Sequence, residues 1–484
     1  MRHMARKTIK NTVLLTLFEI ANPFISLLLI GTMSRNLGAG ALGAYNLLLT
    51  FFFVAHSFTS LGLNTLITRE VSRDPGRAGR FLGTSAILGG VCSLLVGLGI
   101  VGAIRLAGYD ADVQQSGWLV AACLLPSIVI LSVESILIAY EKIEFIVYLA
   151  LIENVGRTLV GLWLIHRGYG VTALMASFTL FRVLTLALNL LVFRRQIGPL
   201  EWTIDPAILR DLLKGIPVFG GILVASTLYW KADVFLLSKM VTLEAVGYYT
   251  AAYRLFAITQ VLPKSFNTSI YPVFSRLFLQ SQESYRKANS LAIRYILVVL
   301  LPVSAGISGL AEPIVRLLFG RDFGSAVPVL KVVIWTLVPY GVVRVFASAM
   351  FASNRQHLDL KVNLLGLAAN LGLNCVLIPR MGILGCAWAT LLSVCLFLLI
   401  QCVYLRREVL PQLRQAEIAR PAAATLAIVA WLVVTPSLNL ALRVAGGAAL
   451  YGGILAWLQV IRLNELKLVL PERVLALFTR EVEL

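Results

Sequence analysis

Long apolar segments, separated by short polar or basic stretches, recur from residue 11 to residue 461. A run of about 18 or more apolar residues can cross the ~30 Å hydrocarbon core of a bilayer as a helix. The pattern predicts fourteen such spans, with ends uncertain by a few residues. Their ranges are 11–33, 42–66, 81–106, 116–140, 143–166, 169–193, 214–240, 246–274, 290–312, 325–352, 358–378, 382–404, 417–436 and 438–461.

Two amphipathic segments lie outside these spans. In the first, "IDPAILRDLLKG", Asp205 can cap a helix whose first residue is Pro206. The second is the tail "NELKLVLPERVLALFTREVEL", which mixes leucines with charges. Both patterns are typical of helices that lie in a membrane interface.

Composition agrees with the apolar pattern. Hydrophobic residues make up 58% of the 484 residues, charged residues only 14%, and the mean hydropathy is +0.85. Soluble proteins carry more polar surface than this. The fold class is therefore an all-α, polytopic membrane protein. No phosphate-binding loop motif occurs, and the six cysteines lie singly in apolar runs, so we expect no metal site and no cofactor.

Basic residues set the orientation, since basic loops stay on the cytoplasmic side. They concentrate in every second connection, as with Arg69, Arg73, Arg77 and Arg80 after the second span. This predicts a multi-pass protein of the inner cell membrane with both termini cytoplasmic. The net charge of +18 then reflects topology and contact with anionic lipids rather than nucleic-acid binding.

The chain also resembles itself. Gly43-Ala44-Tyr45 is repeated as Gly247-Tyr248-Tyr249 at an offset of 204, and Pro126 in the fourth span is matched by Pro339 in the tenth. Because six spans separate the copies, both halves have the same orientation in the membrane. We expect a pseudo-twofold axis along the membrane normal and a substrate site between the halves. Mid-span prolines at 23, 126, 263 and 339 can bend helices.

This repeat divides the chain into five parts. They are a six-helix lobe at 1–195, a cytoplasmic linker with an interfacial helix at 196–213, a second six-helix lobe at 214–405, two additional transmembrane helices at 406–462 and an amphipathic tail at 463–484.

The motifs "SRNLGAGALGAYNLL", "SLGLNTLITREVSR" and "KADVFLLSKMVTLEAVGYYTAAYRL" resemble those of the Wzx-type polysaccharide flippases. These belong to the MOP superfamily, with the MATE drug antiporters and the lipid II flippases. The resemblance covers most of residues 10–405. It implies two six-helix lobes around a central cavity, alternating access, and transfer of an undecaprenyl-diphosphate-linked oligosaccharide to the outer leaflet. One departure is that the first two helices carry Glu19 but no mid-span cation.

Charged residues inside the spans are the candidate site, because burying a charge in hydrocarbon is costly and usually serves function. The basic ones assigned to spans are Arg157, Arg182, Lys231, Arg254, Lys264, Lys331 and Arg344. The acidic ones are Glu19, Glu134, Glu153 and Asp233. The positive excess suits a lipid diphosphate. All the cations except Lys331, which can snorkel to the headgroups, are candidates for substrate binding, and the four acids are candidates for coupling to H⁺ or Na⁺.

Spacing refines some of these assignments. Glu153 and Arg157 are four residues apart, which favours an intrahelical ion pair. Arg254 and Lys264, ten apart on one predicted span, differ by about 80° around a helix and are the strongest candidates for contact with the diphosphate. Lys231 and Asp233 point about 160° apart on a helix, so we expect them to have different surroundings.

Two other function classes stay open. A MATE-type antiporter of cationic drugs would need an excess of buried acids. A membrane glycan polymerase or ligase, the enzyme alternative, would need a larger outer loop. We expect a transporter rather than an enzyme, driven by an ion gradient or the membrane potential. Its expected partners are a lipid-linked oligosaccharide, membrane lipids and the glycan polymerase or other assembly machinery.

Overall fold

The computed structural model describes residues 2–405, 415–458 and 460, with side chains described from residue 21 onward except at 218, 222, 356, 357, 360 and 415–417. Every regular element in these ranges is a helix. Contacts divide the chain into two units, Met1–Thr250 and Ala251–Leu484, and the division falls inside helix α8. The amphipathic tail predicted at 463–484 lies outside the described residues.

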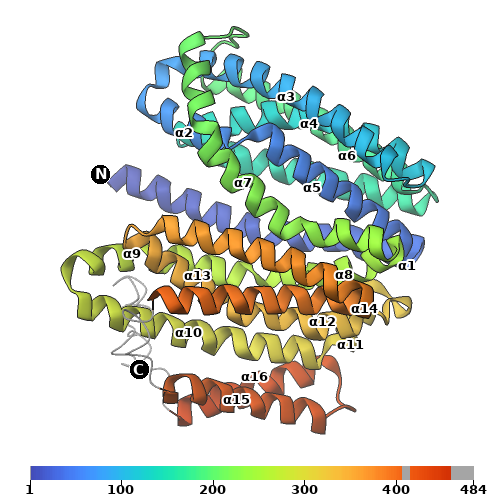
Figure 1. Ribbon diagram of the computed structural model, residues 1–484, viewed down its shortest axis with the longest axis vertical. Helices are drawn as coiled ribbons and strands as arrows, with labels where there is room; N and C mark the ends of the chain where they lie inside the picture. The colour runs from blue at the N-terminus through green and yellow to red at the C-terminus, as the bar shows by residue number, and fades with distance from the viewer. Residues whose placement is uncertain (1, 406–414, 459, 461–484) are drawn as a thin grey trace. The chain divides into compact units, whose positions relative to one another are not determined.

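Unit 1 contains the first seven α-helices, a short 3-10 helix and the start of α8. In chain order these are α1 (Arg2–Ser60), α2 (Leu63–Arg73), η1 (Pro75–Arg77), α3 (Ala78–Leu106), α4 (Ala111–Ala139), α5 (Ile143–His166), α6 (Val171–Gln196), α7 (Pro206–Met240) and α8 (Leu243–Thr259). Helix α4 lies between α3 and α6 and contacts both of them, and α1 packs against α4, α5 and α7 (Figure 1).

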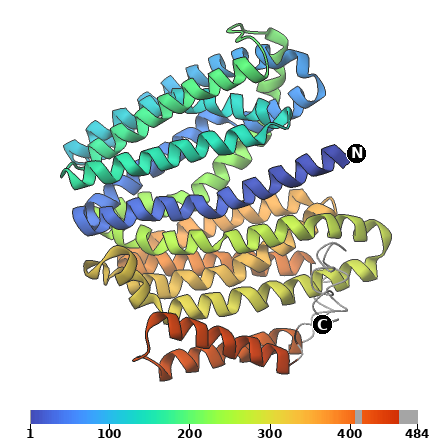
Figure 2. The same ribbon diagram turned by 180° about the vertical axis from the view of Figure 1, so that it is seen from behind.

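Unit 2 contains the remaining helices. These are α9 (Val261–Gln280), α10 (Gln282–Gly309), α11 (Ala311–Phe319), η2 (Arg321–Phe323), α12 (Ala326–Val333), η3 (Ile334–Thr336), α13 (Leu337–Ala352), α14 (Gln356–Leu405), α15 (Gln415–Val434) and α16 (Leu440–Trp457). Helix α10 contacts α9 and α13, and the pair α15–α16 packs beside α10 (Figure 2).

Glycines produce the sharp bends in the two longest helices. Helix α1 contains the first predicted span and residues 42–60 of the second, and it is broken only at Gly38, with φ 80° and ψ −177°. The second span is interrupted at Leu61 and Gly62, which have positive φ, and its last residues belong to α2. Helix α14 likewise contains the eleventh and twelfth spans, with Gly382 at φ 57° and ψ −133°. Glycine tolerates these dihedral angles because it lacks a Cβ atom. The predicted loops at these places are therefore single-residue kinks.

Prolines explain two other departures from the predicted spans. The predicted span 246–274 is two helices, α8 and α9, separated at Gln260. Pro263 has no N–H to donate to the carbonyl of Thr259, so the helix is interrupted one turn before it. In the tenth span the 3-10 helix η3 precedes Pro339 for the same reason. Pro23 and Pro126, by contrast, lie inside the continuous helices α1 and α4.

The predicted cap at Asp205 is confirmed. The carboxylate Oδ1 accepts hydrogen bonds from the backbone N–H groups of Ala207 (2.9 Å) and Ile208 (3.3 Å), and Pro206 is the first helical residue. The helix does not end with the amphipathic segment, however. It continues as α7 to Met240, so the interfacial segment and the seventh span form one helix of 35 residues.

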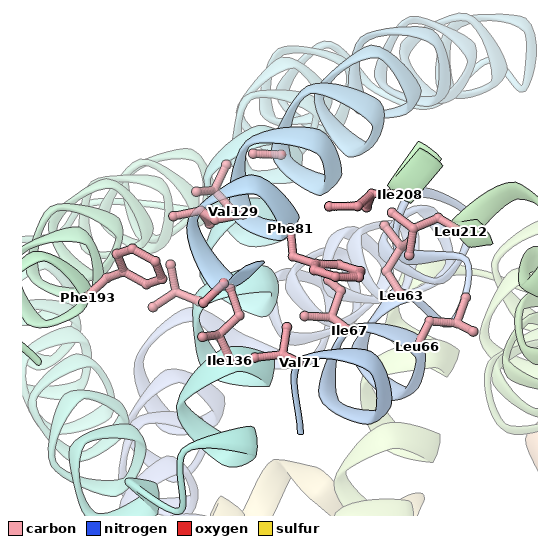
Figure 3. Packing of buried hydrophobic residues seen from close by; sticks show 14 of the residues in the cluster. Leu63, Leu66, Ile67, Val71, Phe81, Val129, Ile136, Phe193, Ile208 and Leu212 are labelled. Atoms are coloured by element: carbon pink, nitrogen blue, oxygen red, sulfur yellow. The ribbon is translucent and has the colours of Figure 1, made fainter. Parts of the chain in front are cut away.

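The core nearest to this segment is an apolar cluster where α2, α3, α4, α6 and α7 meet (Figure 3). Helix α2 contributes one face, with Leu63, Leu66, Ile67 and Val71 all at 1% exposure or less. Ile208 and Leu212 of α7 complete the cluster at 0% and 1%. Burying each such side chain stabilises the fold by about 1.5–3 kcal/mol relative to exposure.

Ten helical segments in the described part are long and apolar enough to cross a membrane. Two of them, Ala21–Ser60 and Lys361–Leu405, are 40 and 45 residues long and contain the glycine kinks. Helix α15 contributes a shorter apolar segment, Ile418–Val434. The chain is therefore a multi-pass, all-α membrane protein.

Candidate functional site

Charged side chains from α5 and α6 meet inside unit 1. Arg182 Nε of α6 lies 3.2 Å from Glu153 Oε1 of α5, and the two side chains are only 23% and 8% exposed. The ion pair joins two neighbouring helices that pack against each other. Because both groups are removed from water, each depends on the other for compensation of its charge.

The predicted intrahelical pair between Glu153 and Arg157 is wrong. Arg157 instead donates from Nη2 to Asn154 Oδ1, at 3.2 Å on its own helix, while Glu153 pairs with Arg182. A spacing of four residues makes an intrahelical pair possible, but Glu153 pairs instead with a cation from a packed neighbouring helix. In a bundle interior, tertiary geometry decides which cation the carboxylate meets.

Aromatic rings line the two arginines. The guanidinium carbon of Arg182 lies 5.7 Å from the ring centroid of Phe52 and 5.5 Å from that of Phe178. Arg157 lies 5.1 Å from the Phe178 ring. Cation–π contacts of this kind gain strength where water is excluded. They hold both guanidinium groups in place through ring faces contributed by α1 and α6.

Two further ionisable groups face this cluster. Glu134 of α4 is half-buried and experiences the charges of Arg182 and Glu153. His56 of α1 stacks on Phe52 at a centroid distance of 5.7 Å and experiences the charge of Arg182. The cluster therefore combines groups from α1, α4, α5 and α6. Sequence reasoning assigns no role to His56, because nothing in its local pattern sets it apart from a packed aromatic residue.

Lys231 and Asp233 have different partners, as their spacing predicts. Asp233 is 5% exposed and accepts a hydrogen bond of 2.8 Å from the hydroxyl of Tyr249 on α8. Lys231 is half-buried, and its ammonium group lies 5.0 Å from the centroid of the Phe53 ring on α1. Asp233 is thus held within the packed interior of unit 1, whereas Lys231 is partly accessible.

Arg254 and Lys264 do not share one helix. Arg254 belongs to α8 and is half-buried, whereas Lys264 belongs to α9 and is exposed. The interruption at Gln260 lies between them, so the angle of 80° that an unbroken helix predicts does not apply. Their exposure differs, and Arg254 is the better shielded of the two.

Arg344 of α13 belongs to a network of neutral polar groups in unit 2. Ser348, one turn further along α13, hydrogen-bonds with the side-chain amide of Asn267 on α9. With the Asn267 amide turned so that all its neighbours are satisfied, its oxygen accepts from Arg344 Nη2 at 3.3 Å. Arg344 is half-buried. An amide acceptor orients the guanidinium group without cancelling its charge.

An acid that interacts with this network is Asp359, in the first turn of α14. Its carboxylate accepts hydrogen bonds from Asn363 at 3.0 Å and from Gln401 at 3.4 Å, and it interacts electrostatically with Arg344. The kink at Gly382 folds α14 back so that residues 359 and 401 meet. Sequence reasoning misses Asp359 and Gln401, because the fold-back brings together residues at opposite ends of two predicted spans.

Two further charged residues lie in predicted spans, the candidate Glu19 and Arg294. Glu19 lies in α1, but its side chain is outside the described side chains. Arg294 of α10 is missed by sequence reasoning although it lies within the predicted span 290–312. It is only 6% exposed and contacts the Tyr295 ring and hydroxyl. Among the described residues, no group of three or more His, Cys, Asp or Glu residues could hold a metal ion.

Glycines from the two sequence repeats form one close helix crossing in unit 1. A Cβ atom on Gly43 would lie 1.8 Å from the carbonyl oxygen of Leu243, and one on Gly247 would lie 2.0 Å from that of Ala39. Residues 39 and 243 are equivalent at the repeat offset of 204, as are residues 43 and 247. The contact is therefore reciprocal, like an interface across a twofold axis.

The fold is shared with known transporters. It matches the structure of "Lipid II flippase MurJ, inward closed conformation" with a TM-score of 0.76 at 15% identity, covering 92% of this chain and 98% of that one. It also matches an inward-facing multidrug-resistance MATE transporter of the MOP superfamily, with a TM-score of 0.66 at 15% identity over 81% of this chain and 98% of that one. The chain therefore has the MurJ/MATE fold.

The sequence defines the family within this fold. Residues 8–278 match the model of the family described as "Polysaccharide biosynthesis protein". The chain belongs to this family, which consists of transporters of the flippase type and not of enzymes. Two relatives come from Haloferax volcanii. "Probable low-salt glycan biosynthesis flippase Agl15" is 24% identical over 81% of both chains, and "Probable flippase AglR" is 24% identical over 90% of this chain and 93% of its own.

Proposed function

We propose that the protein flips an undecaprenyl-diphosphate-linked oligosaccharide, a polysaccharide repeat unit, from the cytoplasmic to the outer leaflet of the cell membrane. Membership of the polysaccharide biosynthesis family and similarity to two proteins named as flippases support a lipid-linked glycan as the substrate. The lipid carrier and the direction of transfer are finer proposals, based on the resemblance of the sequence motifs to the Wzx-type flippases.

The distribution of exposure among the candidate charges carries this proposal. The acids Glu153 and Asp233 are buried, at 6% and 5% exposure, and each already has a partner. The cations Lys231, Arg254 and Arg344 are half-buried, and Lys264 is exposed. Glu134 is half-buried like these cations, so among the described candidates a ligand that enters from water meets more cations than carboxylates. This arrangement favours a diphosphate over the cationic substrate of a drug antiporter.

We further propose fourteen crossings and two six-helix lobes related by a pseudo-twofold axis. The ten long segments agree with this number when the kinked helices α1 and α14 each count as two crossings. The broken pair α8–α9 and helix α15 then add one crossing each. The reciprocal glycine contact between α1 and α8 supports the axis. Alternating access then requires these helices to separate and close again, which small residues permit.

Ion coupling is a separate part of the proposal. Of the four candidate acids, Glu153 and Asp233 are committed to Arg182 and Tyr249. Glu134 is half-buried, and among the described contacts no hydrogen bond or ion pair is recorded for it. It faces the Arg182–Glu153 pair, so its protonation, or binding of Na⁺, would change the charge of the cluster. We propose Glu134 as the principal coupling residue.

The test of function is transport of a fluorescent undecaprenyl-diphosphate oligosaccharide in proteoliposomes. Loss of a charge-assisted contact costs about 1.5–3 kcal/mol, or roughly ten- to a hundredfold in affinity. We expect Arg254→Ala to show such a loss, Arg254→Lys to keep part of the activity and Arg254→Glu to be inactive. The matched control is Arg276→Glu, which reverses an exposed charge on α9. Full transport by correctly inserted Arg254→Glu would contradict a role for this arginine in binding the diphosphate.

A further inference from the structure

The linker between α6 and α7 is fixed to α3 through its backbone. Thr84 Oγ1 accepts a hydrogen bond of 3.0 Å from the N–H of Asp205. A Cβ atom on Gly83 would lie only 2.0 Å from the carbonyl oxygen of Glu201, so the two backbones are in direct contact. Residues 201–205 are therefore held in one position, and the side chains they present outward are part of a fixed surface.

That surface carries exposed apolar side chains beside its polar ones. Trp202 is 50% exposed and Ile204 is 51% exposed, although both are bound to this fixed backbone. Leu213, two turns into α7, is 50% exposed. A tryptophan beside exposed aliphatic residues is typical of the boundary between headgroups and acyl chains, where one end of the indole stays apolar and the N–H is hydrated.

The first turns of α7 have two distinct faces. Ile208 and Leu212 point into the apolar core, where Figure 3 shows them with Leu63 and Leu66 of α2. The opposite face carries an open groove of about 440 Å³, which we call the α7 groove. Its lining residues, spaced at three and four positions along the helix, are Pro206, Leu209, Arg210, Leu213 and Lys214.

The cations of the α7 groove differ from the neighbouring arginines in their ion pairing. Arg77 and Arg80 on the adjoining segment lie 4.0 Å and 3.9 Å from the carboxylate of Asp205. For the exposed Arg210 and Lys214, no ion pair is recorded in the described part of the chain. The N–H groups at the start of α7 are already capped by Asp205. Any anion in the groove would therefore be held by these two side chains, not by the helix terminus.

We propose that the α7 groove binds the phosphate headgroup of an anionic glycerophospholipid from the adjoining leaflet. The phosphate accepts hydrogen bonds from Arg210 and Lys214, whose charges are complementary to it. The acyl chains extend over Leu209 and Leu213. The occupant is a phospholipid rather than free phosphate, because most of the lining is apolar. This lipid would fix the junction between the linker and α7.

The test is native mass spectrometry of the delipidated full-length protein, titrated with phosphatidylglycerol, phosphatidylcholine or inorganic phosphate. A basic residue near a membrane surface contributes enough that losing two reduces affinity by about thirtyfold. We expect tight binding of phosphatidylglycerol to be weakened by roughly this factor in Arg210→Gln/Lys214→Gln, and to be retained in Arg210→Lys/Lys214→Arg. The matched control is Arg194→Gln/Arg195→Gln, which removes two other exposed cations of unit 1.

Three results would overturn the proposal. Equal affinity for phosphatidylcholine would show that the charge is not recognised, and equal weakening in the control would show that only the net charge of the protein matters. Displacement of the lipid by millimolar inorganic phosphate would indicate a simple anion site. The measurement is of binding alone, so it is independent of whether the protein transports a glycan.

Discussion

The two units of the chain stabilise their internal polar groups in different ways. In unit 1, opposite charges pair between helices, as Arg182 of α6 does with Glu153 of α5 at 3.2 Å. In unit 2, amides and hydroxyls carry most of the network. Asn370 donates to Ser393 at 3.2 Å, and Asn374 donates to Asn370 at 3.0 Å. Both networks are buried, but only the first is built from full charges.

The two units therefore differ in how much uncompensated positive charge they offer to a substrate. A buried ion pair is electrically neutral from a distance, so the Arg182–Glu153 pair offers little net charge to a substrate. Arg344 is oriented by the neutral amide of Asn267 and interacts electrostatically with the acid Asp359, which also accepts hydrogen bonds from two amides. Its positive charge is therefore less compensated. We infer that unit 2 contributes more to binding the diphosphate, and unit 1 more to coupling and rigidity.

The largest expected effect is on stability and separates the two networks. Arg182→Ala leaves the Glu153 carboxylate buried without its ion partner, which typically costs about 3–5 kcal/mol. Arg344→Ala removes contacts to an amide and a partly satisfied acid, for which about 1.5–3 kcal/mol is expected. Thermal unfolding of the two purified variants in one detergent compares these costs.

The control for this comparison is Arg182→Met/Glu153→Leu. Replacing both partners of a buried pair by apolar residues of similar size removes the uncompensated charge, so much of the lost stability should return. If Arg182→Ala is no less stable than Arg344→Ala, the charge pair in unit 1 does not carry the structural role that its burial indicates.

The sequence predicts the membrane class, the family and most helices correctly, because apolar runs and local motifs report them directly. It also identifies Arg157, Arg182, Glu134 and Glu153 as candidates, since a charge inside an apolar run is visible without a structure. It does not predict that Arg182 pairs with Glu153, because they lie on different helices and only the packing of α5 on α6 brings them together.

The sequence misses Asp359 and Gln401 because their contact also depends on tertiary packing. Asp359 lies at the end of a predicted span and Gln401 is an uncharged residue near the end of the next, so neither interrupts a hydrophobic pattern. Their contact depends on the fold-back at Gly382. The predicted angle between Arg254 and Lys264 is wrong for a different reason. It requires one ideal helix across Pro263, and the helix is interrupted there.

The second prediction concerns coupling in unit 1 and is of intermediate size. Transport coupled to one proton should change its driving force by about 1.4 kcal/mol, or tenfold at equilibrium, for each unit of imposed pH difference. Glu134→Gln keeps the size of the side chain and removes its charge, so we expect this dependence to disappear while transport without a gradient persists. Coupling to Na⁺ should be lost in the same way across a sodium gradient.

Asp233→Asn is the matched variant, because Asp233 is a buried acid of the same unit whose hydrogen bond to Tyr249 an amide oxygen can preserve. We expect it to retain the dependence on the gradient. Wild-type coupling in Glu134→Gln, together with loss in Asp233→Asn, would move the coupling role to α7.

The smallest expected effect is the coupling between Glu153 and Arg157, which is measured beside that between Glu153 and Arg182. In a double-mutant cycle, Glu153→Gln with Arg182→Gln should give a coupling energy of several kcal/mol, because the pair is close and poorly hydrated. The same cycle with Arg157→Gln should give about 0.5 kcal/mol or less, the range of an ordinary intrahelical pair, because Arg157 donates to Asn154 instead. Unfolding in detergent measures both cycles. Equal coupling energies would mean that Glu153 exchanges between the two arginines. The carboxylate would then belong to a three-residue charge cluster in which neither arginine is its fixed partner, and the ion pair could not be assigned to the packing of α5 on α6 alone.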